Sequence, residues 1–393
     1  MTSQPGQRIA AIDVMRALTM FLMLFVNDIP ALKGIPHWLG HARWDEDMLG
    51  FADTIFPTFL FCVGMSIPFA IEGRLRRGES QFSTLVHILL RSLALIVMGI
   101  FTMSAEEGGG IVGYHRFSYL AVIAFFLVWI DYRSWKVATW LHYVLRGLGI
   151  ALLAGLVVWR DIHGDSMHTG WWGILGLIGW AYLFSSLLYL ITRNRLGASL
   201  VAWAAVMILF VVDAMHVIPG EWLSSVALLP FFPGGWSCRA IVMAGLAASV
   251  VLRHFASCGH SRRLPAVFAL VAAAMLLLGL AAHPHWIVSK IQGTPTWVFF
   301  CLAISFALMA LIYWLTDICG KASWFAFLRT AGTATLTCYL IPYIWYPLRD
   351  QLGLYIPESL WHGLPGIIIS LAYSYIVILI ASLLVKVRIK VRL

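Results

Sequence analysis

Long apolar stretches alternate with short polar ones along almost the whole chain. Runs of roughly 17 to 25 apolar residues are each long enough to cross a ~30 Å hydrocarbon core as a helix. The pattern predicts an all-α fold, a polytopic membrane bundle of about twelve transmembrane helices. The expected spans are residues 10–29, 49–71, 85–104, 113–130, 137–158, 171–192, 197–213, 235–252, 264–282, 296–316, 325–348 and 364–386.

The form of the eighth span, residues 235–252, stays open at this point. Pro230, Pro233 and Gly234 precede it, and such residues interrupt helices. The segment could be a helix or a re-entrant element that lines a cavity. One span more or fewer is therefore compatible with the sequence.

Composition supports a membrane protein. Hydrophobic side chains make up 61% of the chain and charged ones 11%, too little polar surface to cover a soluble globule of this size. The first apolar span lacks a small-residue cleavage signature and is expected to be retained. No long soluble insert divides the chain, so residues 1–393 are expected to form a single transmembrane domain.

Six cysteines lie scattered in apolar stretches without C-x-x-C or Cys/His spacing. This argues against a disulfide framework and against a zinc site, so no metal is expected. They are Cys62, Cys238, Cys258, Cys301, Cys319 and Cys338.

Basic residues orient the predicted bundle. With the N-terminus inside, the inner loops and the C-terminal tail hold most Lys and Arg residues, as the positive-inside rule requires. The outer loops hold Lys33, Arg43, Arg160, Lys290 and Arg349. Both termini are then cytoplasmic. Topology also accounts for most of the net charge of +9 without a nucleic-acid partner.

The polar hairpin between the first two spans is where chemistry is expected. Residues 27–57 read NDIPALKGIPHWLGHARWDEDMLGFADTIFP and contain two histidines, several carboxylates and an asparagine. Histidine and carboxylate side chains are the common proton carriers of enzymes. With the N-terminus inside, this hairpin faces outward.

Several runs in and beyond this region share the order of a known family. The first two spans and their loop contain RIAAIDVMRALTMFLMLFVN, HARWDED and GFADTIFPTFLFCVGMSIPFAIEGRLRRG. Later come GYHRFSYLAVIAFF and SKIQGTPTWVFFCLAISFALMALIYWLTDICG. Together they resemble the transmembrane acetyltransferase family that includes heparan-alpha-glucosaminide N-acetyltransferase, in particular its bacterial NagX-like branch. The resemblance is good at the two ends and poor over residues 137–225.

The resemblance implies acetyl transfer from acetyl-CoA, bound at the cytoplasmic face as co-substrate, to a glucosamine-type sugar on the other side. It makes the loop histidine catalytic, and His41 is the matching position. Attack of an amine on a thioester needs a base for the released proton. His41 could be that base or carry the acetyl group transiently. Asp45, four residues on, would reach its second nitrogen if the segment were helical. Without the resemblance, His41 would be read as a solvated loop residue.

Other polar residues of the outer face are weaker candidates. Asn27 could polarise the thioester carbonyl or simply cap a helix, and His37 is a backup base or a substrate contact. Asp53, near the outer end of the second span, is costly there unless paired or functional. Arg116 matches the family's arginine and could neutralise Asp53 or bind substrate. Lys290, in the Ser-Lys match, could bind the acceptor or sit at the membrane interface.

Two groups on the inner side are candidates for the acetyl-CoA site. Asp13 and Arg16 share one helical face and could pair as an anchor of the first span or contact the donor. Arg74, Arg76 and Arg77 form the densest basic cluster of the inner loops. They could bind the CoA phosphates, although topology alone also produces such clusters.

Two other classes of function stay open. A secondary transporter of N-acetylglucosamine or a related sugar would stack its tryptophans on sugar rings and place its acids near the bilayer midplane. No matched pair of Gly/Pro-broken spans appears in the two halves, which argues against it. A structural partner in an envelope complex is the weaker alternative. The sequence leaves open which amino sugar is the acceptor, and whether the chain is a homodimer.

Overall fold

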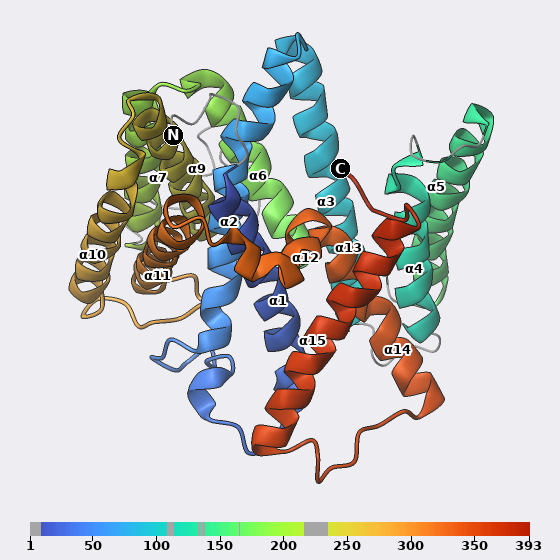
Figure 1. Cartoon of the computed structure of the whole chain (residues 1–393). Helices are drawn as coiled ribbons and strands as arrows, with labels where there is room; N and C mark the ends of the chain where they lie inside the picture. Colours follow the sequence, from blue (N-terminus) through green and yellow to red (C-terminus); the bar gives the residue numbers. More distant parts are fainter. Residues whose placement is uncertain (1–8, 108–113, 133–134, 136–137, 165, 216–234) are drawn as a thin grey trace.

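The structure is a computed structural model that describes residues 9–107, 114–132, 135, 138–164, 166–215 and 235–393 (Figure 1). Within these residues the chain is helical, and β-pairing is limited to two isolated bridges. The principal helices are α1 Ala10–Asp28, α2 Phe51–Arg76, α3 Gln81–Glu107, α4 Tyr114–Trp129, α5 Thr139–Ile162, α6 Gly173–Thr192, α7 Leu196–Ala214, α9 Gly235–Ser257, α10 Leu264–Ala282, α11 Pro295–Tyr313, α12 Arg329–Thr333, α13 Thr335–Leu340, α14 Pro342–Leu352 and α15 Gly363–Lys386.

Length and hydropathy confirm a multi-pass membrane protein. Among the described residues, 10 helices are long and apolar enough to cross a membrane, and a shorter apolar helix covers His115–Trp129. The eighth predicted span is one continuous helix, α9, and most of its residues are buried. It is therefore a full span and not a re-entrant element. Pro230, Pro233 and Gly234 lie outside the described residues.

The prediction of one helix over residues 325–348 is wrong. The segment is divided into part of a 3₁₀ turn, Ala322–Leu328, and the short helices α12, α13 and α14. The main break is at Ala334, where φ is −128° and ψ is 41°. Pro342 starts α14, because proline fits the first turn of a helix but has no N–H to continue one. Apolar composition alone could not show these breaks.

The basic turn after α2 and the polar hairpin after α1 lie at opposite ends of the bundle (Figure 1). The turn after α2, with its arginines, lies at the upper end in this view, as does the α9–α10 connection at residues 258–263. The hairpin of residues 29–50 and the α10–α11 loop of residues 283–294 lie together at the lower end. The polar hairpin is thus brought beside a loop that is distant in sequence.

Helices α2 and α9 approach closely at two glycines near the centre of the bundle. A Cβ on Gly64 would overlap the carbonyl oxygen of Val242, and a Cβ on Gly245 would overlap that of Phe61. Small residues allow such contact between membrane helices, where packing replaces the hydrophobic effect as the driving force. This contact fixes α2, the helix that carries Asp53.

We expect Gly245→Ala to destabilise the protein by about 1–3 kcal/mol, since the new methyl group meets backbone that cannot move independently. The measurement is thermal unfolding of the detergent-solubilised protein. Gly155→Ala in α5 is the matched control, because a Cβ there meets nothing within 4 Å. Equal unfolding temperatures for the two variants would contradict the close-contact interpretation.

Candidate active site

Asp53 organises the polar hairpin. It lies in the first turn of α2, where the helix dipole favours a carboxylate. Its Oδ2 accepts a hydrogen bond from the backbone N–H of Ala42 at 2.9 Å. Gly50 precedes the helix, and a Cβ at this position would overlap the carbonyl oxygen of Gly40. Glycine therefore lets the two ends of residues 40–50 come together over the carboxylate.

His41 is the partner of Asp53. Its Nδ1 lies 2.6 Å from Asp53 Oδ1, and the Asp53 side chain is 2% exposed while that of His41 is 37% exposed. Because an ionised carboxylate only accepts hydrogen bonds, Nδ1 carries the proton. In neutral His41 the other nitrogen, Nε2, then has a free lone pair, and none of the described residues hydrogen-bonds to it. This arrangement can accept a proton from a ligand.

Lys290 completes the group from the α10–α11 loop. Its Nζ lies 3.7 Å from Asp53 Oδ1 and 3.4 Å from His41 Nδ1. Burial lowers the pKa of Lys290, and the charge of Asp53 partly opposes this. The three side chains form an interacting cluster of imidazole, carboxylate and amine, which we call the His41 site.

Asp47 holds the two loops of the His41 site together. Its Oδ1 accepts the backbone N–H of Val288 at 2.7 Å, and its Oδ2 lies 2.8 Å from His283 Nε2. The hydrogen bond from Val288 is the largest of the interactions that lower the pKa of Asp47, followed by those with His283. Met48 also donates its N–H to the carbonyl oxygen of Val288. Sequence reasoning missed Asp47, although its place in the Asp45–Asp47 acidic run was a signal.

Helix α11 contacts the His41 site from the protein interior. Trp297 Nε1 donates to the carbonyl oxygen of Asp53 at 3.2 Å, and the buried Cys301 lies against the same oxygen. Thr294 and Ser289 hydrogen-bond to each other where the loop enters α11. The S-K-x-x-x-T-P-x-W run therefore places Lys290 and Trp297 on the two sides of Asp53.

The predicted contact between His41 and Asp45 is not formed, and His37 has a partner of its own. The segment from His41 to Asp45 is not helical, and Asp45 is exposed with its carboxylate 3.9 Å from Arg43. Asp53 takes the place that Asp45 was expected to occupy beside His41. His37 pairs with Glu46 at 3.1 Å and is 61% exposed. Its hydrogen-bond partner among the described residues, Glu46, lies outside the His41 site.

Asn27 and Arg116 lie apart from this group. Asn27 is exposed at the end of α1 and lines a separate polar cavity with Glu106 and Tyr343. Arg116 is exposed in the first turn of α4. The described partners of the Asp53 carboxylate are His41, Ala42 and Lys290, so the predicted neutralisation of Asp53 by Arg116 is not found.

The inner-side candidates make ordered contacts. Arg16 lies 3.3 Å from Asp13 and also donates to Ser66 Oγ at 2.7 Å and to the carbonyl oxygen of Gly332 at 3.2 Å. Arg16 thus joins α1 to α2 and to α12. In the second cluster Glu79 accepts from Arg74 and Arg77, while Arg76 is exposed.

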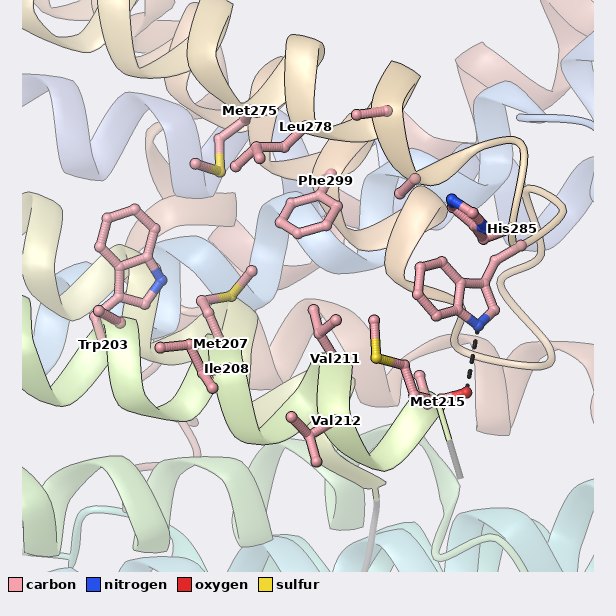
Figure 2. A pocket seen from close by; sticks show the side chains of 15 residues that line it. Trp203, Met207, Ile208, Val211, Val212, Met215, Met275, Leu278, His285 and Phe299 are labelled. Carbon is pink, nitrogen blue, oxygen red and sulfur yellow. Dashed lines mark hydrogen bonds between the residues drawn. The ribbon is translucent and has the colours of Figure 1, made fainter. Parts of the chain in front are cut away.

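A large apolar pocket lies elsewhere in the molecule. It has a volume of about 840 Å³ and is formed by α7, α10 and α11 (Figure 2). Trp203, Met207, Met275 and Phe299 are typical of its lining, and His285 is the titratable side chain among the lining residues. The described lining residues include no carboxylate or lysine beside this histidine, so acid–base chemistry is better placed at the His41 site.

Comparison with known proteins adds independent information. A family model described as "Domain of unknown function (DUF5009)" matches residues 8–236. Heparan-alpha-glucosaminide N-acetyltransferase from Homo sapiens is 38% identical over 94 residues, which are 24% of this chain and 13% of that protein. The enzyme of the same name from Mus musculus is 29% identical over 138 residues, 33% of this chain and 20% of that protein. The chain therefore aligns with a fifth or less of each relative.

We expect Lys290 to react with an amine-specific acylating reagent at lower pH than Lys33. Burial lowers the pKa of Lys290, whereas pairing with Glu358 raises that of Lys33. A lower pKa leaves more of the unprotonated, reactive amine at a given pH. The measurement is the pH midpoint of labelling at each lysine by mass spectrometry.

The variant Asp53→Asn provides the control. It removes the negative charge that favours the protonated form of Lys290, so its labelling midpoint should move to still lower pH while that of Lys33 stays in place. A Lys290 midpoint at or above that of Lys33 in the native protein would show that the amine is not in a desolvating environment.

Proposed function

The chain belongs to the family described as a domain of unknown function (DUF5009), and we propose that it is an integral membrane acetyltransferase. In this proposal the acetyl group of cytoplasmic acetyl-CoA is transferred to the amino group of a glucosamine-type sugar. The hairpin and the His41 site face the periplasm of a bacterial inner membrane. The names of the human and mouse relatives support N-acetyl transfer, although the aligned segments are short.

The observation that carries the proposal is the His41–Asp53 pair with Lys290 beside it. A buried carboxylate on Nδ1 fixes the ring and its tautomer and stabilises the cation that forms when Nε2 takes up a proton. This is the requirement for a general base in acyl transfer. The exposed edge of the His41 ring lets a substrate amine approach, while the edge that faces Asp53 is shielded from solvent.

In the proposed reaction, His41 carries a proton from the acceptor amine to the leaving thiolate. The lone pair of the acceptor nitrogen attacks the thioester carbonyl carbon, and His41 Nε2 accepts the proton that the nitrogen loses. Collapse of the intermediate breaks the C–S bond, and the same proton passes from His41 to the leaving thiolate. Lys290 Nζ lies 3.7 Å from Asp53 Oδ1 and pairs with this carboxylate. The alternative is a transient acetyl-histidine: His41 Nε2 attacks the thioester carbon and the C–S bond breaks. The acceptor amine then attacks the acetyl carbon, the bond from that carbon to Nε2 breaks, and the amine loses its proton to the freed imidazole.

For the donor, the inner basic cluster stays our candidate. Arg74 and Arg76 lie in the last turn of α2, Arg77 follows them, and Glu79 pairs with Arg74 and Arg77. This turn therefore gathers guanidinium groups, which suit phosphates. Arg16 is better explained as a link between α1, α2 and α12, since two of its partners belong to other helices. We therefore assign the Asp13–Arg16 pair a positioning role and not contact with the donor.

Transport is the less favoured function. The carboxylates that contact histidine in the described structure are at the loop end of the bundle, as Asp53 and Asp47 show. Coupling of transport to protons would favour acids near the bilayer midplane. The described carboxylates of the hairpin are instead placed to act on a ligand at the surface.

We expect His41→Ala to lower acetyl transfer by about 10²–10⁴-fold, the usual contribution of a general base. Asp53→Asn should also lower the rate, because the ring would lose the partner that stabilises its protonated form. The assay is the transfer of labelled acetyl groups from acetyl-CoA to glucosamine by the purified protein in detergent.

The control is His37→Ala, which removes the other histidine of the hairpin. His37 pairs with Glu46 outside the His41 site, so its loss should leave turnover within about threefold of native. Full activity of His41→Ala would exclude it as base and as acetyl carrier. Failure of the native protein to bind acetyl-CoA would exclude the acetyltransferase as a whole.

A further inference from the structure

A second polar site lies at the outer end of α1. A cavity of about 340 Å³ is lined by residues of α1, α3, α4, α6, α13 and α14 and by Pro30. Its polar lining residues are Asn27, Glu106, Ser118, Tyr339, Tyr343 and Tyr346. His41, Asp53 and Lys290 do not belong to this lining, so the cavity is separate from the His41 site.

Hydrogen bonds set the shape of this lining. Tyr343 OH donates to Glu106 Oε1 at 2.6 Å and lies 3.0 Å from Tyr339 OH. Ser118 Oγ donates to the carbonyl oxygen of Tyr343 at 2.7 Å, which ties α4 to α14. The tyrosine hydroxyls therefore have fixed positions before any ligand arrives. Preorganised donors and acceptors reduce the entropy that a ligand must lose on binding.

Two groups in the cavity keep unused hydrogen-bonding capacity. The structure gives Glu106 Oε2 no partner among the described residues, and the exposed Asn27 amide has none either. The carboxylate can accept two further hydrogen bonds, and the amide can both donate and accept. These free hydrogen-bonding groups suit a ligand with several polar hydrogens.

A buried carboxylate stands next to this lining. Asp28 is 8% exposed, and its Oδ1 accepts a hydrogen bond from Tyr346 OH at 2.8 Å. Ser370 also interacts with the Asp28 carboxyl group, and Tyr373 interacts with Tyr346. Asp28 is thus a second carboxyl group close to that of Glu106.

The balance of charge determines the class of ligand. Arg349 stacks on the ring of Tyr346 at 5.3 Å, and its charge is matched by Asp350 at 3.0 Å. Glu106 and Asp28 therefore favour a cation at the cavity and disfavour a nucleotide with its phosphates. A volume of about 340 Å³ is at the small end of ligand pockets, which suits a single sugar ring and is too small for CoA.

We propose that this cavity binds an amino sugar in its protonated form, with the ammonium group on Glu106 and the ring hydroxyls on Asn27 and the tyrosines. The choice of glucosamine as ligand rests on the function proposed above. Attack at the His41 site needs the free amine, whereas a carboxylate stabilises the ammonium ion. The cavity is therefore a holding site for the acceptor and not the place of transfer.

The test is equilibrium binding of labelled glucosamine to the purified protein in detergent, without acetyl-CoA. Glu106→Gln should weaken binding by about 10-fold or more, the effect of losing a charge-assisted hydrogen bond. Asn27→Ala should weaken it by about threefold or more, and its fold is not at risk because the described Asn27 side chain has no internal partner. N-acetylglucosamine, which has no ammonium group, should bind more weakly and respond little to Glu106→Gln.

Glu107→Gln is the matched control. Glu107 is the next residue in the chain, pairs with His168 and does not line the cavity, so its loss should leave binding within about twofold of native. The second control is His41→Ala, which should stop turnover and leave glucosamine binding unchanged. Native-like binding in Glu106→Gln, or loss of binding in His41→Ala, would overturn the holding site. Because transfer is measured separately, a native protein that acetylates glucosamine while Glu106→Gln binds it normally would refute this cavity and keep the proposed function.

Discussion

The buried carboxylate of Asp53, at the loop end of the helix bundle, determines how the hairpin is built. Burial of an ion costs several kcal/mol unless partners replace the lost water. Asp53 is 1% exposed, and its compensation comes from the His41 ring, the Ala42 N–H and the start of α2. Any conformation of the hairpin that moves these groups leaves the charge uncompensated. The carboxylate therefore restricts a loop that contains little regular secondary structure.

The same constraint extends to a loop that is far away in sequence. Lys290 can contribute to the balance of charge only if residues 283–294 stay against the hairpin, and Asp47 provides that link through Val288 and His283. Helix α11 contributes from the protein interior, where Trp297 donates to the backbone of Asp53. Close contact of α2 with α9 at Gly64 and Gly245 holds the helix that carries the carboxylate. The His41 site thus depends on several elements that approach α2.

Much of the helical architecture was accessible from the sequence, because the length and hydropathy of a membrane span are local properties. The broken segment around Ala334 was not, since no charge or proline marks that position and the break depends on contacts with α1. The choice of His41 and Lys290 needed the family resemblance as well as residue chemistry. Their joint contact with Asp53 could not be predicted, because the helical spacing that suggested Asp45 does not apply to an irregular loop. The role of Asp47 could not be predicted either, because its partners come from the α10–α11 loop, which is distant in sequence.

The hairpin after α1 also connects two environments that differ in how well they stabilise a protonated amine. Asn27 at its beginning belongs to a cavity with a free carboxylate oxygen, where an amine is held as a cation. His41, further along the same connection, presents a lone pair beside Lys290, and a neighbouring positive charge disfavours an ammonium ion. A sugar that passed from one environment to the other would leave the Glu106 carboxylate for a site where Lys290 balances the charge of Asp53, so its ammonium form would lose the interaction that stabilises it. Deprotonation of the acceptor would then be driven by position in the protein, and the base at His41 would need to remove only the proton released on attack.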